Sequence, residues 1–124
     1  MPSYERAGYD PPAPVARALV AADGEAAVDV PLLIDTGADS SIIPRSVAVL
    51  VGAELSPAPA DIISYTGEAR EAEQAVLTVR FERVTVRGAF LVLDTEQGVL
   101  GRNVLNNLVL TLDGPGLNWE IGRR

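Results

Sequence analysis

The sequence predicts a single all-β domain with one or two short helices. Its 124 residues match the usual size of one compact domain. Hydrophobic residues make up 48% of the chain and charged residues 22%, as in soluble globular proteins with a packed core. Aromatic residues make up only 5%, and most apolar residues are Val, Leu, Ile and Ala in short runs. Such runs favour strands over long helices.

The first 34 residues divide into an arm and a hairpin. Residues 1–14 contain four prolines and few apolar side chains. We therefore expect an extended arm, either disordered or docked as a strap, ahead of a domain formed by residues 15–124. Residues 15–34 hold two strand-like runs around a turn at Asp23-Gly24, and alternate residues from Ala26 to Ile34 are apolar. This pattern predicts a hairpin that leads directly into Asp35.

The middle of the chain contains a short helix, a linker and a hairpin. Pro44 suits the first turn of a helix that runs to Val51 and ends at Gly52. Residues 53–60 carry two prolines and are expected to be a linker. Residues 62–65 and 75–81 are expected to be extended segments around a polar tip at residues 66–68.

The last forty or so residues predict more strands and a second helix. Apolar residues alternate with others between Val84 and Val92, which predicts a strand pair that turns near Gly88. Residues 101–107 have room for about two helical turns. Residues 108–112 form a strand with leucines on one face, residues 113–116 a turn, and residues 117–121 the closing strand.

Charge and composition exclude several classes of function. The net charge is −7 and the ten Lys and Arg residues form no cluster, so nucleic acids and anionic membranes are not expected partners. No segment has the features of a signal peptide or a membrane span, so we expect a soluble, cytoplasmic protein. Cys and His are absent, which excludes disulfides, thiol nucleophiles, Ser-His triads and nearly all zinc chemistry. Carboxylates remain as catalysts, with no metal or cofactor expected.

The segment most informative about chemistry is LLIDTGADSSIIP, residues 32–44. Three apolar strand residues lead into Asp35, and Gly37, which has no Cβ, allows the backbone to approach closely. A carboxylate at the end of a buried strand is held by a rigid element. An Asp-Thr-Gly triplet alone is weak evidence, because it is also consistent with an ordinary Asx-type turn.

A second segment makes the pattern more specific. Residues 99–105 read VLGRNVL, two hydrophobic residues and Gly followed by Arg and Asn. Together, the two segments resemble the signatures of the retropepsin family, the retroviral-type aspartic peptidases, over about residues 15–121. The resemblance implies a single-lobed acid-protease barrel in which residues 99–101 cross the loop that bears the catalytic Asp35.

The resemblance also implies roles for the residues around Asp35. Thr36 would hydrogen-bond across subunits, although it could be a surface threonine. Asp39 and Arg102 would pair near the active-site base, or form only an exposed ion pair of little energetic value. Asn103 stands where many relatives have Asp, and no catalytic consequence is expected.

The flap of the family would correspond to residues 62–77. Tyr65, Thr66 and Gly67 would contact substrate at or near its tip. Tyr65 could equally be an ordinary cross-strand aromatic residue.

A single Asp-Thr-Gly implies two chains. Aspartic peptidase chemistry requires two carboxylates that share one proton. Asp23, Asp94 and Asp113 lack the flanking pattern and are interpreted as turn residues. The second Asp35 is therefore expected from a symmetry-related copy in a homodimer. Residues 117–121 or the arm could form the interface, unless the turn at 113–116 folds the last strand back on its own subunit.

Three functions remain open at this stage. The first is an endopeptidase that cleaves extended polypeptides under the flap. The second is a catalytically silent module of the same fold that binds peptide or dimerises a partner. The third, a small β-barrel binding protein unrelated to peptidases, has little support. The intact Asp35 triplet favours the first.

Overall fold

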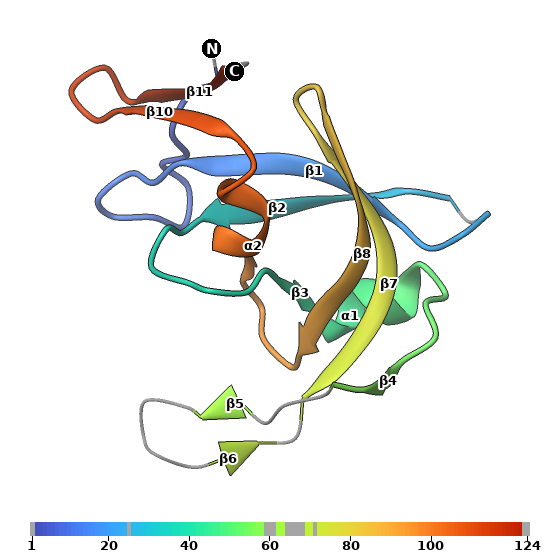
Figure 1. Cartoon of the computed structure of the whole chain (residues 1–124). Helices are drawn as coiled ribbons and strands as arrows, with labels where there is room; N and C mark the ends of the chain where they lie inside the picture. Colours follow the sequence, from blue (N-terminus) through green and yellow to red (C-terminus); the bar gives the residue numbers. More distant parts are fainter. Residues whose placement is uncertain (1, 25, 59–61, 64–68, 71, 123–124) are drawn as a thin grey trace.

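The computed structural model describes residues 2–24, 26–58, 62–63, 69–70 and 72–122. It consists mainly of strands, with two short helices (Figure 1). The strands are β1 (Val15–Ala21), β2 (Val28–Ile34), β3 (Ile42–Pro44), β4 (Ser56–Pro57), β5 (Ile62–Ile63), β6 (Ala69–Arg70), β7 (Glu73–Phe81), β8 (Val84–Leu93), β9 (Gly98–Leu100), β10 (Val109–Asp113) and β11 (Asn118–Gly122). The helices are α1 (Arg45–Leu50) and α2 (Arg102–Leu105).

The main sheet closes on itself. Its strand order is β1-β2-β9-β3-β8-β7-β4, and β1 also pairs with β7. Six strands therefore form a closed barrel, with β4 paired to β7 outside the ring. Closure leaves the strands of the ring with few free edges. This architecture confirms the predicted all-β barrel with two short helices.

The first hairpin forms as its alternation predicts. β1 and β2 are antiparallel, with Val15 opposite Leu33 and Val20 opposite Val28. Gly24 takes a positive φ of 72° in the connecting turn, a backbone conformation that glycine adopts without steric cost. Alternate β1 residues from Ala16 to Val20 are buried. The hairpin therefore presents one face to the barrel interior and delivers Asp35 at its end.

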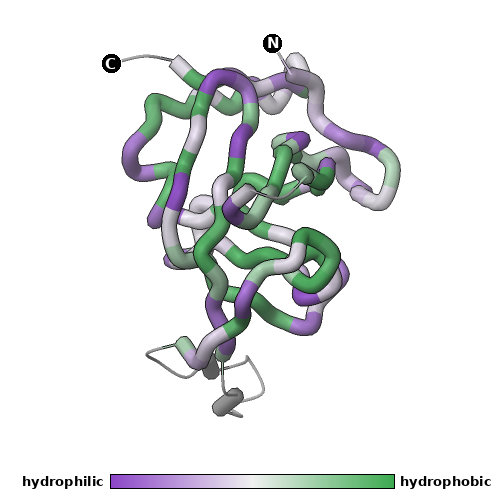
Figure 2. Tube along the Cα trace, turned by 90° about the vertical axis from the view of Figure 1, so that its right-hand side faces the viewer, coloured by the Kyte–Doolittle hydropathy of each residue, from purple (hydrophilic) through white to green (hydrophobic). Residues whose placement is uncertain are grey.

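Apolar side chains from every long strand of the barrel meet inside it. The fully buried side chains include Val20, Leu32, Leu77, Val79 and Leu100. Figure 2 shows hydrophobic and hydrophilic residues interspersed along the Cα trace. Every second residue from Ala75 to Phe81 in β7 is buried, the period expected when one face of a strand packs inward.

Both predicted helices are present, though shorter than expected. α1 follows Pro44, whose φ of −58° suits a helix start, and Gly52 takes a positive φ of 74° just past its end. No helix in the described part of the chain is long and apolar enough to cross a membrane. The expected linker at 53–60 contains β4, in which Ser56 lies opposite Gln74.

The turn predicted near Gly88 is wrong. β8 runs without interruption through Gly88, which lies opposite Leu77 in a β7–β8 pairing that extends to Phe81 opposite Val84. Only two residues connect these strands, and Glu82 takes the positive φ of 51° that such tight hairpins require. Tertiary pairing along the whole of β7 therefore overrides the local preference of glycine for a turn.

The C-terminal strands fold back on their own subunit. β10 and β11 are antiparallel, with Val109 opposite Gly122 and Asp113 opposite Asn118. The described part of the N-terminal arm docks beside them as a strap. Tyr4 N–H donates to the Leu117 carbonyl at 2.8 Å, and Trp119 N–H donates to the Pro2 carbonyl at 2.9 Å.

Candidate active site

Asp35 lies immediately after the buried end of β2. Leu32 is completely buried and Ile34 is only 6% exposed, so the last residues of the strand are fixed in the core. The Asp35 backbone N–H donates to the Leu100 carbonyl at 3.0 Å, and its side chain is half-buried. The aspartate is thus held between two strands, at the end of a rigid element, as predicted.

The turn after Asp35 orients the carboxylate. Gly37 N–H donates to Asp35 Oδ1 at 2.9 Å, and Ala38 N–H donates to the Asp35 carbonyl at 3.2 Å. A Cβ atom on Gly37 would lie 3.1 Å from the same Oδ1, closer than an ordinary contact. The Asx-type turn is therefore present, and it leaves the second carboxylate oxygen without a hydrogen bond to the described residues.

The segment from β9 into α2 crosses this loop. Arg102 N–H donates to the Ala38 carbonyl at 2.8 Å, and Asn103 N–H donates to the Asp39 carbonyl at 3.2 Å. A Cβ atom on Gly101 would lie 2.6 Å from the Ser40 carbonyl carbon and oxygen. Only glycine permits this approach without a shift of the backbone. The predicted crossing of residues 99–101 over the Asp35 loop is present.

Ser41 is a site residue that the sequence analysis did not single out. Its side chain is only 1% exposed. Ser41 Oγ donates to Asn103 Oδ1 at 2.8 Å and accepts from the Gly101 N–H at 2.9 Å, and Ser41 N–H also donates to Asn103 Oδ1, at 2.9 Å. These bonds tie the two motifs together. A serine just before an apolar pair, inside the first motif, was the only available signal.

Arg102 does not pair with Asp39 as expected. None of the ion pairs among the described residues joins them. Arg102 Nη1 instead donates to the Thr36 carbonyl at 2.7 Å. That carbonyl is exposed and has no other hydrogen bond within the described chain. The guanidinium therefore supports the loop through its backbone.

A known protein family matches a stretch of the chain that includes both motifs. Residues 22–107 match the family described as "gag-polyprotein putative aspartyl protease". The chain belongs to this family. Its retropepsin-like character was expected from the same two motifs, and the match confirms that resemblance.

A solved structure has the same fold. The EIAV protease in complex with the inhibitor HBY-793 superposes with a TM-score of 0.64 at 21% sequence identity. The alignment covers 77% of this chain and 86% of the EIAV protease chain. No curated protein sequence matches the chain. The structural similarity supports the retroviral protease fold for this aspartyl protease.

The segment expected to form a flap lies partly outside the described residues. Tyr65, Thr66 and Gly67 lie outside the described residues. The flanking segments β5 and β6 are antiparallel, with Ile62 opposite Arg70 and Ile63 opposite Ala69. The first arm of the expected hairpin therefore pairs with residues 69–70, whereas the expected second arm, residues 75–81, lies in β7 and pairs with β8 and β1 of the barrel.

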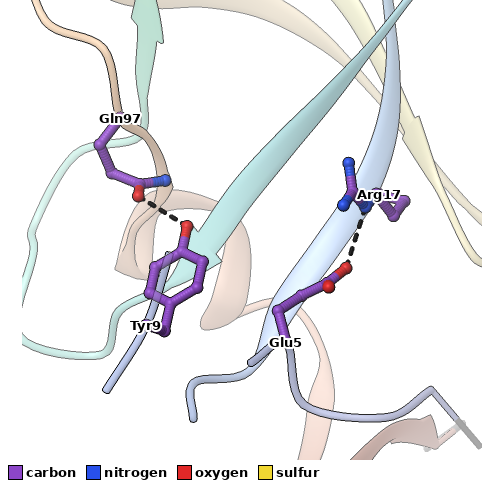
Figure 3. A network of polar contacts seen from close by, with 4 residues as sticks. All are labelled: Glu5, Tyr9, Arg17 and Gln97. Atoms are coloured by element: carbon purple, nitrogen blue, oxygen red, sulfur yellow. Dashed lines mark hydrogen bonds and ion pairs between the residues drawn. The ribbon is translucent and has the colours of Figure 1, made fainter. Parts of the chain in front are cut away.

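The N-terminal strap also contacts the segment that leads into β9. Tyr9 Oη donates to Gln97 Oε1 at 2.6 Å (Figure 3). Gln97 Nε2 donates in turn to the Gly98 carbonyl at 2.8 Å. Glu5 on the same strap pairs with Arg17 of β1 at 2.9 Å. The strap therefore braces the approach to the crossing segment, a contact that local sequence patterns did not indicate.

Two grooves of the described surface lie away from Asp35. One, of about 1120 Å³, lies between the β7–β8 turn and the β10–β11 hairpin, with Val84, Leu108 and Ile121 in its lining. The other, of about 430 Å³, has Ala53 and Val76 in its lining. No group of three or more acidic residues in the described chain could hold a metal ion.

Proposed function

We propose that this aspartyl protease is an endopeptidase that acts as a homodimer. A water molecule held between two Asp35 carboxylates, one from each subunit, would attack the carbonyl carbon of a peptide bond. The observation that carries the proposal is the fixed position of Asp35, between β2 and the β9 crossing, with one carboxylate oxygen left for chemistry.

The chemistry requires the second carboxylate. One carboxylate must take a proton from water while the other, protonated, donates to the scissile carbonyl oxygen. Two nearby carboxylates retain one proton between them because two close negative charges repel. Activity that needs one ionised and one protonated carboxylate would follow a bell-shaped pH profile.

The two aspartates that directly precede a glycine, Asp23 and Asp113, do not provide this partner. Asp23 forms an exposed ion pair with Arg87, and Asp113 Oδ1 accepts from the Gly116 N–H at 2.9 Å within a turn. Both therefore have local structural partners. A second copy of Asp35 has the same local surroundings as the first. A two-fold dimer, which would bring the two together, is therefore proposed.

Thr36 and the flap complete the proposed site. The Thr36 side chain is exposed, and its hydroxyl makes no hydrogen bond with the described residues, so it is available to the other subunit. The hairpin around residues 66–68 would cover an extended polypeptide substrate. Tyr65, Thr66 and Gly67 are proposed to contact that polypeptide.

The test uses an unfolded polypeptide as substrate. Asp35→Asn keeps the size of the side chain but removes its ionisable group, so cleavage should fall by at least about a thousandfold. Asp94→Asn, an exposed aspartate followed by threonine but not glycine, is the matched control and should cleave like the parent. Equal cleavage by Asp35→Asn would overturn the proposal and leave a silent peptide-binding module.

Subunit mixing tests the requirement for two carboxylates. Excess Asp35→Asn protein should suppress the parent enzyme, because mixed dimers hold only one ionisable Asp35. Unchanged activity in the mixture, with subunit exchange verified, would contradict the shared site.

A further inference from the structure

Within the described chain, β10 pairs only with β11, so its other edge is free. β11 is flanked on one side by β10 and on the other by the strap, through the bonds Trp119 N–H to Pro2 and Tyr4 N–H to Leu117. Both edges of β11 are therefore occupied within one subunit. Interleaving this last strand with a second copy would break those contacts.

The direction of the β10 backbone groups follows from the same bonds. Trp119 directs its N–H toward the strap, so its partner Leu112 belongs to a pair that exchanges no hydrogen bonds across the hairpin. The same alternation applies to Leu110, which lies opposite Ile121. The N–H and C=O groups of Leu110 and Leu112 therefore point away from β11, and no strand of the described chain pairs with them.

This edge lacks the usual protection against pairing. Natural edge strands carry lysines, prolines or bulges that block association. β10 reads VLTLD, and its one charged residue, Asp113, lies at the end of the strand in the hairpin turn. Leu112 lies on the same face as the buried Trp119 but remains 46% exposed. A neighbouring strand on this edge would cover it.

We propose that β10 pairs antiparallel with β10 of a second copy, about a two-fold axis at Thr111. In this register Leu110 faces Leu112 of the other copy, and the outward groups of these leucines form about four hydrogen bonds. Apolar side chains meet across the interface. Each Asp113 faces a Val109 rather than the other Asp113.

The β10–β11 hairpin lies where dimerisation could also bring two Asp35 side chains together. The β10–β11 hairpin and the loop between β2 and β3, which carries Asp35, both lie on the left side of Figure 1. α2 links the two, since it follows the crossing segment and leads into β10. The inference rests on the proposed homodimeric function and specifies its interface.

This interface has a consequence for regulation. Because each hairpin closes within one chain, a subunit can fold completely before it meets its partner. Dimerisation is then reversible without unfolding, and specific activity should rise with protein concentration until dimers dominate.

Charge substitution at the two-fold axis tests the proposal. Thr111 is exposed; it lies opposite Glu120 within its own hairpin and, in this register, opposite the other Thr111 across the interface. Glu120 therefore adds to the repulsion in Thr111→Glu and offsets part of it in Thr111→Lys. Thr111→Lys and Thr111→Glu each place like charges opposite one another, so each variant should dimerise at least about tenfold more weakly than the parent. An equal mixture of the two variants should regain the association and the peptide cleavage of the parent to within about threefold.

Thr85→Lys and Thr85→Glu are the matched controls, because Thr85 is an exposed strand threonine of the barrel. They should dimerise like the parent. Sedimentation equilibrium at low salt measures association, since salt screens the charges. Thermal unfolding establishes that every variant is folded.

The outcomes separate the interface from the activity. Suppose that the parent shows Asp35-dependent cleavage and the Thr111 variants dimerise as tightly as the parent. The proposed interface would then be overturned, while the proposed peptidase activity would stand. A mixture that fails to recover would overturn the two-fold at Thr111. A parent protein that is monomeric at every concentration would overturn the interface. Whether that protein still shows Asp35-dependent cleavage would decide the proposed function separately.

Discussion

Replacing Ser41 by Ala should destabilise the link between the two motifs. The hydroxyl donates to Asn103 Oδ1 at 2.8 Å and accepts from the Gly101 N–H at 2.9 Å. Its loss removes one hydrogen bond worth about 1 kcal/mol and leaves a buried N–H without an acceptor, which costs about 1–3 kcal/mol. With Ser41 only 1% exposed, water does not readily replace the hydroxyl. The free energy of unfolding should fall by about 2–4 kcal/mol.

Urea denaturation measures this loss. Trp119 is the single tryptophan of the chain and is 1% exposed, so its fluorescence reports unfolding of the domain. For a loss of about 3 kcal/mol and a denaturant slope of about 1.5 kcal/mol per M, the midpoint should fall by about 2 M. A loss of this size is a large share of the stability of a small domain, typically about 5–15 kcal/mol.

Ser40→Ala is the matched control for this experiment. Ser40 precedes Ser41, and its side chain makes no hydrogen bond with the described residues, so the free energy of unfolding should change by less than about 0.5 kcal/mol. Equal urea midpoints and equal slopes for the two variants would refute a stabilising role of the Ser41 hydroxyl. The hydroxyl of Ser41 would then contribute nothing measurable to stability.

Three further predictions use the same fold. Gly101→Ala should lower the free energy of unfolding by about 3 kcal/mol or more, because the added Cβ would lie 2.6 Å from the Ser40 backbone. Gly88→Ala is the control, since its Cβ would meet nothing within 4 Å and the urea midpoint should stay nearly unchanged. Equal midpoints for the two variants would contradict this prediction. Asn103→Asp keeps an acceptor for Ser41 and should change the free energy of unfolding by less than about 1 kcal/mol, whereas Asn103→Leu should match Ser41→Ala in urea. The hydrogen bond from Arg87 holds the pKa of Asp23 below its usual value of 3.8, so the exposed pair stabilises the fold above that pH and loses its effect as the pH falls through the depressed pKa. Thermal unfolding from pH 5 to pH 2 should therefore show a slightly shallower acid decline for Asp23→Asn at low salt, and an unchanged curve would count against the pair.

Local patterns accounted for much of the barrel. Alternation of apolar residues predicted the β1–β2 hairpin, and Asp113 to Gly116 predicted the final turn, because each signal lies within the segment that it shapes. The turn expected at Gly88 was wrong, since the strand opposite it decided its conformation. A glycine tolerates a turn but does not require one.

Local sequence predicted some features of the candidate site, and tertiary structure decided the others. The sequence by itself determined that Asp35 follows a buried strand and a tight Gly turn, and that a second motif with Gly101 belongs with it. Only the tertiary structure decided which groups meet: Ser41 with Asn103, Arg102 with the Thr36 carbonyl, and the strap with Gln97. Those partners lie sixty or more residues apart, and closure of the barrel brings them within hydrogen-bond distance, so no local pattern encodes them.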